Sequence, residues 1–231
     1  MTNFGQLTGC PPFCMPDFTP NPASTINSSG VVGGVSFGYN QQLRVIGLPL
    51  LVGAEGFALF GSNSTSISGI PGTGGIAPPA VMANDNTTVR FGNEYGILGK
   101  IGMVVYPFHA PMLIAFNGGI GFQNVNTTLN CTATGACGSN GLGSSALTTS
   151  KTLTGSLVGA EVSMPLVNVP VLGMGASWLP GGTIGFQYLH GSFGNSTTTM
   201  GMPSQIQIAA NQRVTTNNYM ATLRIPIFQQ R

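Results

Sequence analysis

The chain has 231 residues, of which only 5% are charged, and its formal net charge is +2. Water-soluble domains carry roughly 25% charged residues, so this composition argues against an ordinary soluble protein. The 35 glycines and 16 prolines argue against long helices, because both residue types destabilise a helix interior. The basic residues form no run in the sequence, so we expect no nucleic-acid partner.

The two most apolar windows, 43–61 and 101–120, are poor candidates for membrane-spanning helices. A spanning helix needs about 20 mostly apolar residues. The first window contains Arg44 and Pro49, and the second contains Pro107. Transmembrane helices are therefore the weaker alternative.

Apolar and polar residues alternate with a period of two along seven segments, which predicts β-strands with one apolar face. In chain order these segments are 31–47, 50–61, 87–106, 111–126, 150–166, 171–193 and 216–228. In 111–126, for example, Ile114 and Phe116 alternate with Ala115 and Asn117. The pattern predicts an all-β protein.

Charged residues fall on the small, polar face of these strands. They are Arg44, Glu55, Arg90, Glu94, Lys100, Glu161 and Arg224. A soluble sandwich would expose its charges and bury its large apolar residues, whereas here the charges share a face with glycine. Glycine and paired charges suit a narrow barrel interior, and bulky apolar residues suit a lipid-facing exterior. We expect these seven side chains to form a charge network that fills the lumen.

The connections between the segments alternate in length. Short ones at 47–49, 107–110 and 167–170 alternate with long polar ones at 62–86, 127–149 and 194–215. This layout is typical of outer-membrane barrels with tight periplasmic turns and long outer loops. The sequence therefore predicts an antiparallel transmembrane β-barrel of about eight strands.

We expect three parts along the chain. Residues 1–30 would hold the first outer loop and a first strand, for which 2–9 is a poor candidate because its apolar residues do not alternate. Residues 31–228 would form the barrel, and 229–231 a short tail. Because the sequence does not start with a basic segment followed by an apolar one, we expect the export signal to have been removed.

The four cysteines form two pairs that are close in sequence, Cys10 with Cys14 and Cys131 with Cys137. Two small disulfide loops would suit an oxidising compartment. Free thiols and metal binding are the alternatives, but neither histidine lies near a cysteine in the sequence. We expect no metal and no cofactor.

Five aromatic residues of the predicted strands are interpreted as a belt at the membrane interface. They are Tyr39, Tyr95, Tyr106, Trp178 and Tyr188. The belt makes outer-membrane lipid the expected partner.

Several short glycine-based motifs resemble those of small alphaproteobacterial surface barrels of the opacity-protein class. The motifs are Gly33-Gly34-Val35-Ser36-Phe37-Gly38-Tyr39-Asn40, Val52-Gly53-Ala54-Glu55-Gly56, Gly118-Gly119-Ile120-Gly121-Phe122 and Val158-Gly159-Ala160-Glu161. The resemblance covers roughly 31–228 and implies eight strands and a structural or adhesive role. It departs from the family at the C-terminus, where Gln229-Gln230-Arg231 follows Phe228.

One motif suggests an enzyme. The segment containing His190 and Ser192 resembles the His-x-Ser segment of the outer-membrane lipid A deacylase. A Ser–His esterase needs an acid to orient its imidazole, and no Asp or Glu follows Glu161. A polar strand end is the favoured interpretation, and His109 is interpreted as a solvated turn residue.

Three functions remain open. A structural or adhesive cell-surface barrel, self-associating through its uncharged loops, is the favoured one, and we expect no enzyme activity. A passive channel for small solutes is the second, because inward charges can also line a pore. A lipid A esterase is the third.

Overall fold

The computed structural model describes residues 2–4, 24–26, 29–45, 48–68, 86–107, 110–131, 145–168, 182–200 and 208–225. Ten strands lie in these ranges. They are β1 (Thr2–Phe4), β2 (Ser24–Ile26), β3 (Gly33–Val45), β4 (Leu48–Phe60), β5 (Asn63–Ser68), β6 (Asn86–Val105), β7 (Met112–Cys131), β8 (Ser145–Pro165), β9 (Thr183–Met200) and β10 (Ile208–Arg224). A short 3₁₀ helix, η3 (Leu166–Asn168), follows β8.

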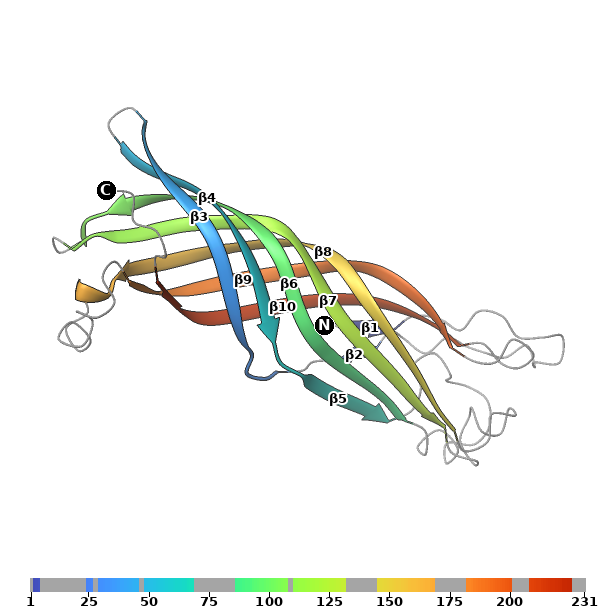
Figure 1. The fold of residues 1–231 in the computed structure, drawn as a ribbon. Coiled ribbons are helices and arrows are strands. Elements are labelled where there is room, and N and C mark those ends of the chain that lie inside the picture. The colour runs from blue at the N-terminus through green and yellow to red at the C-terminus, as the bar shows by residue number, and fades with distance from the viewer. Residues whose placement is uncertain are drawn as a thin grey trace.

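Eight of these strands form one antiparallel sheet, which confirms the predicted all-β fold. The hydrogen-bonded order is β10-β9-β8-β7-β6-β4-β3, and β5 continues the line of β4 by pairing with β6. The sheet curls into an elongated, barrel-like shape (Figure 1). Below, the turn end is the end where β6 leads into β7, and the loop end is the end where β7 leads toward β8. Within the described residues, no helix is long and apolar enough to cross a lipid bilayer.

The two edge strands of the ladder, β3 and β10, run in the same direction. This follows from the strand order, because six antiparallel steps separate them. A strand that closed the gap between them in antiparallel fashion would have to run the opposite way. The short β1 lies against β10 and pairs with β2, so the described part of the N-terminal segment contributes only three residues on that side.

The turn-end half of the sheet is apolar outside and polar inside. Large apolar side chains on its outer face are exposed, including Ile97 at 67%, Phe116 at 66% and Phe186 at 73%. Residues at alternate positions of the same strands point inward and are buried. The buried polar ones include Glu55, Lys100, Asn117, Glu161, Ser163 and Gln187. This distribution is the reverse of that in a water-soluble protein.

The loop-end half has the opposite arrangement, with an apolar interior and a polar exterior. Val125 and Leu129 point inward and are buried. Outside, the Thr128 and Thr148 hydroxyls lie 3.1 Å apart across β7 and β8. The Asn130 Nδ2 donates to the Asn86 Oδ1 at 2.5 Å across β7 and β6.

All three predicted long loops contain strand residues. In the first, 62–86, β5 spans Asn63–Ser68. β7 continues to Cys131, β8 begins at Ser145 and β9 continues to Met200, inside the predicted loops 127–149 and 194–215. The Thr- and Asn-rich composition of these stretches resembles that of loops, although they form the outward-facing residues of strands. The predicted turn at 107–110 is tight as expected, and the Ala110 N–H donates to the Pro107 carbonyl at 3.1 Å.

Inward-facing glycines let the strands approach one another on the concave face. A Cβ on Gly119 would lie 1.9 Å from the Ile97 carbonyl oxygen, and one on Gly159 would lie 2.2 Å from the Tyr188 carbonyl oxygen. Real side chains cannot occupy such positions. These glycines are therefore required by the tight curvature of the sheet.

Candidate functional site

A buried cluster of four charged side chains lies inside the curled sheet near the turn end. The Lys100 Nζ lies 2.9 Å from the Glu55 Oε2 and 2.7 Å from the Glu161 Oε2. Arg224 binds Glu161 through two donors, one of them at 3.1 Å from Nη2 to Oε2, and its Nη2 lies 3.5 Å from the Glu55 Oε2. We call these four residues the lumen charge cluster.

The cluster draws one residue from each of β4, β6, β8 and β10. Period-two alternation points all four side chains to the same face, and the curl of the sheet brings them together. The cluster contains two cations and two anions, so its formal charge is zero. Lys100 and Glu161 are almost completely buried, with side-chain exposures of 1% and 0%. A buried charge is tolerated only when it is paired and hydrogen-bonded, and each member of this cluster meets that condition.

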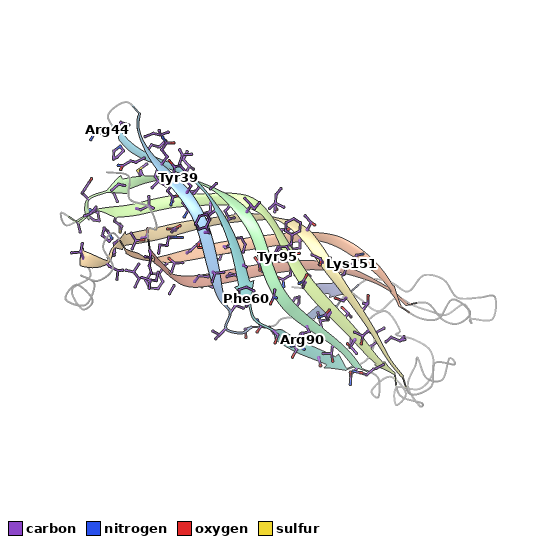
Figure 2. All side chains as sticks on the ribbon, viewed as in Figure 1. Tyr39, Arg44, Phe60, Arg90, Tyr95 and Lys151 are labelled. Atoms are coloured by element: carbon purple, nitrogen blue, oxygen red, sulfur yellow. The ribbon has the colours of Figure 1, made fainter. Side chains whose placement is uncertain are left out.

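The structure places Arg90 and Arg44 outside this cluster, which corrects the expectation of a seven-membered network. Arg90 is exposed on the outer face. A β-bulge between Phe91 and Glu94 shifts the register of β6 against β7, so the even positions before the bulge point outward. Arg44 is exposed near the turn-side end of the edge strand β3. Figure 2 shows Arg44 and Arg90 toward opposite ends of the molecule.

Glu94 points inward but lies apart from the lumen charge cluster. Its Oε2 accepts a hydrogen bond from the Asn218 Nδ2 at 3.0 Å, and the side chain is buried. Among the described residues, no cation pairs with it at ion-pair distance. The contact that Glu94 makes with β10 is therefore a hydrogen bond from an amide, not an ion pair.

An apolar layer lies on the loop side of the lumen charge cluster. Its buried members are Val89, Leu98, Val125, Leu129, Leu153, Leu157, Leu189, Phe193 and Val214. Leu189 and Phe193 are 0% exposed. Any path along the axis would have to pass between these packed side chains.

Two pairs of aromatic rings lie near the loop-side limit of the exposed apolar surface. Tyr95 stacks on Phe122 with centroids 5.3 Å apart, and Tyr188 lies 5.0 Å from Tyr219 in a tilted arrangement. Of the other predicted belt residues, Tyr39 and Tyr106 are exposed. Phe122 and Tyr219 were not predicted as belt residues, although their outward positions follow from the alternation.

Some predicted site residues lie outside the described part of the chain. They are Cys10, Cys14, Cys137, Trp178 and His109. Cys131 ends β7, but its side chain is not described. The disulfides stay predictions.

His190 and Ser192 lie on the outer face of β9, because their neighbours Leu189 and Phe193 point inward. The His190 Nδ1 lies 2.9 Å from the Asn217 Oδ1, which also accepts a hydrogen bond from the Tyr188 hydroxyl at 2.8 Å. All the described carboxylates, those of Glu55, Glu94 and Glu161, are buried inside. An amide, not a carboxylate, therefore contacts this histidine, and the acid of an esterase triad has no counterpart among the described residues.

Two buried neutral residues of the lumen were not singled out from the sequence. Asn117 pairs in register with Lys100, and Gln187 pairs with Glu161. Both are 5% exposed. Their inward positions follow from the alternation, but attention to charge alone misses them. The described residues contain no group of three or more His, Cys, Asp or Glu side chains arranged to hold a metal ion.

Comparison of this chain with protein-family models, curated proteins and solved structures finds no match. The fold and the side-chain geometry therefore carry the functional argument.

Proposed function

We propose that the chain is a structural protein of the bacterial outer membrane, a barrel that spans the bilayer and has a filled lumen. The observation that carries this proposal is the reversed distribution of side chains. Lys100 is 3% exposed whereas Phe116 is 66% exposed. In water this arrangement would bury charge and expose hydrocarbon, both at a cost in free energy. In a bilayer it is the favourable one.

The height of the apolar outer surface supports the same proposal. It covers 95–105 on β6 and 112–122 on β7, about 11 residues on each strand. A tilted strand that crosses a bilayer uses about 9–11 residues. Paired aromatic rings lie at the loop-side limit of this surface, where outer-membrane barrels carry an aromatic girdle.

A filled lumen is favoured over a channel. The lumen charge cluster is internally neutralised, and the apolar layer above it is closely packed. A sheet of about eight strands encloses a space that its own side chains can fill. Leu98 and Leu157, each 1% exposed, fill the interior of the sheet, where an open channel would contain water.

Conductance and flotation together test this proposal. Purified protein is refolded into phosphatidylcholine vesicles, and the vesicles are floated on a density gradient. We expect the protein to float with the lipid and to resist extraction at alkaline pH. Fused into a planar bilayer, it should give no steady openings. Protein left at the bottom of the gradient would contradict the membrane location, and regular conductance steps would contradict the filled lumen.

The polar outer face of the loop-end half supports a surface role. Across β5 to β8, Ser66 contacts Thr88 at 2.7 Å, and the Thr152 hydroxyl donates to the Asn124 Oδ1 at 2.8 Å. Such hydroxyl and amide groups can donate and accept hydrogen bonds across an interface with a second copy. We expect a species larger than a monomer in mild detergent, and sedimentation of monomer alone would contradict self-association.

A further inference from the structure

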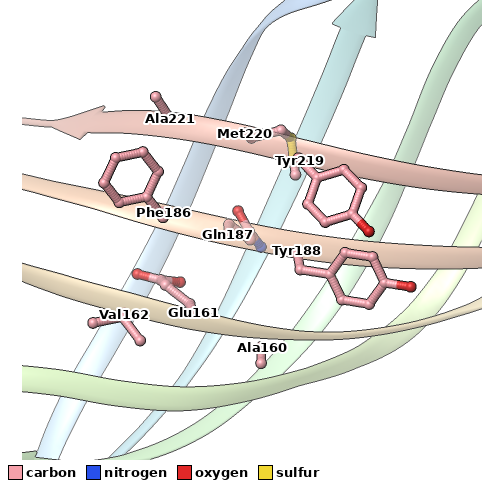
Figure 3. A pocket seen from close by; sticks show the side chains of 9 residues that line it. All are labelled: Ala160, Glu161, Val162, Phe186, Gln187, Tyr188, Tyr219, Met220 and Ala221. Carbon is pink, nitrogen blue, oxygen red and sulfur yellow. The ribbon is translucent and has the colours of Figure 1, made fainter. Parts of the chain in front are cut away.

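A shallow hollow of about 430 Å³ lies over β8, β9 and β10. Its walls are two rows of outward-facing residues that follow the strand register. One row is Ala160, Tyr188 and Tyr219, and the other is Val162, Phe186 and Ala221. Figure 3 shows Phe186 on one side and the two tyrosines together on the other. Alanines occupy the β10 position beside Phe186 (Ala221) and the β8 position beside Tyr188 (Ala160), so the hollow is open where larger residues would close it.

A polar rim borders the hollow on the loop side. The Tyr188 hydroxyl donates to the Asn217 Oδ1, and the His190 Nδ1 lies 2.9 Å from the same oxygen. His190 and Asn217 pair in register, one outward row beyond Tyr188 and Tyr219. At about 3.3 Å per residue, the rim lies roughly 7 Å along the strands from the tyrosine row. Apolar walls thus pass directly into hydrogen-bonding groups.

The exposed charges of the described chain all have one sign. They are Arg44, Arg90, Lys151 and Arg213. Glu55, Glu94 and Glu161, the acidic residues of the described part, are buried in the lumen. Arg213 lies on the outer face of β10, beyond Asn217 toward the loop end. Arg213 therefore places an exposed guanidinium on the same strand as Asn217, four residues toward the loop end, where it suits a negatively charged group.

We propose that the hollow binds one acyl chain of a phosphate-bearing, anionic membrane lipid. The chain occupies the space between Phe186 and the tyrosine pair, the ester or hydroxyl oxygens meet the rim of His190 and Asn217, and the phosphate faces Arg213. This inference rests on the proposed membrane location, since only there do acyl chains contact the outer face. A volume of about 430 Å³ lies within the range of roughly 300–1,000 Å³ that ligand sites occupy.

Native mass spectrometry of the detergent-solubilised full chain tests this binding. Dimyristoylphosphatidylglycerol is the probe, and dimyristoylphosphatidylcholine has the same chains without net charge. We expect one phosphatidylglycerol to be retained, with an occupancy at least about fivefold above that of phosphatidylcholine at equal concentration. Inorganic phosphate in excess should not displace it, because phosphate lacks the chain that fills the hollow.

Two variants fill the hollow. Ala221→Trp places a large side chain in it from β10, and Ala160→Leu places a smaller one in it from β8. Both should lower the occupancy of phosphatidylglycerol by about fivefold or more. Ala54→Trp is the matched control, because Ala54 is an exposed, outward-facing residue on β4 away from the hollow. The phosphatidylglycerol occupancy of the Ala54→Trp variant should equal that of the unmodified chain.

Three results would overturn the inference. The first is a phosphatidylglycerol occupancy in the folded Ala160→Leu variant equal to that in the unmodified chain. The second is equal retention of phosphatidylglycerol and phosphatidylcholine, and the third is displacement of phosphatidylglycerol by inorganic phosphate. Vesicle flotation of the same preparations separates this failure from failure of the proposed function. Protein that floats but retains no particular lipid contradicts only the lipid site, whereas protein that does not float contradicts the membrane location itself.

Discussion

Arg224 and Glu55 are 169 residues apart in the sequence, yet their side chains meet inside the sheet at 3.5 Å. Arg224 ends the edge strand β10, and Glu55 lies on β4, next to the opposite edge strand β3. Glu161 and Lys100 link the same two residues through β8 and β6. The lumen charge cluster therefore ties both sides of the ladder together and helps to hold the sheet curled.

A double-mutant cycle measures this coupling. Arg224→Gln and Glu55→Gln each remove one charge, and the double variant removes both. We expect a coupling energy of about 0.5–3 kcal/mol between the two sites, in the range observed for residues of one ion-pair network. The free energy of unfolding in urea, measured on protein refolded in vesicles, gives the value. Additive single effects would contradict the role of this pair in holding the curl.

Removal of the central cation should destabilise the protein more strongly. Lys100→Met leaves Glu55 and Glu161 buried with only Arg224 to neutralise them. Breaking a buried ion pair by removing one partner costs about 3–5 kcal/mol, and we expect a loss in this range in the same urea titration.

Arg90→Met is the matched control for Lys100→Met. Both cations lie on β6, but Arg90 is exposed. Its replacement should change the free energy of unfolding by no more than about 0.5 kcal/mol. Similar losses in the two variants would mean that burial in the lumen does not distinguish these residues.

Neighbouring glycines of β7 give a test of the inner face. A Cβ on Gly119 would collide with the backbone of Ile97 and Leu98, whereas one on Gly118 would meet only the Leu157 carbonyl at 3.9 Å. We expect Gly119→Val to lose at least about 3 kcal/mol by overpacking. Gly118→Val should be neutral or stabilising, because valine favours strands. Thermal unfolding followed by circular dichroism compares them, and equal melting temperatures would contradict the close approach of β6 and β7.

Much of this fold could be predicted from the sequence because barrel strands have an exact side-chain period. Glu55, Lys100, Glu161 and Arg224 all occupy the polar phase of their segments, and the structure brings these four together. Period and phase are local properties. They determine which face a residue occupies without any knowledge of its partners.

Two features could not be predicted in this way. The bulge between Phe91 and Glu94 adds a residue to β6. No local pattern distinguishes it from continuous alternation, so alternation alone places Arg90 on the wrong face. On the loop-end side of the aromatic pairs, the outer face of the sheet becomes polar and the inner face becomes apolar. Asn124, Asn126 and Thr128 then resemble loop residues, although they are the outer face of β7.

A charge placed on the outer face should distinguish a bilayer from water. Phe116 lies near the middle of the apolar stretch of β7 and is 66% exposed. Because Arg at the bilayer midplane costs about 2–4 kcal/mol, Phe116→Arg should lower the free energy of unfolding in vesicles by that amount. Thr128→Arg, on the outer face of the same strand toward the loop end, should change it by no more than about 0.5 kcal/mol. In a water-soluble fold, Arg in place of an exposed Phe would be neutral or would improve solubility. A Phe116→Arg protein as stable as the unmodified chain would therefore contradict the proposed bilayer around this part of the sheet.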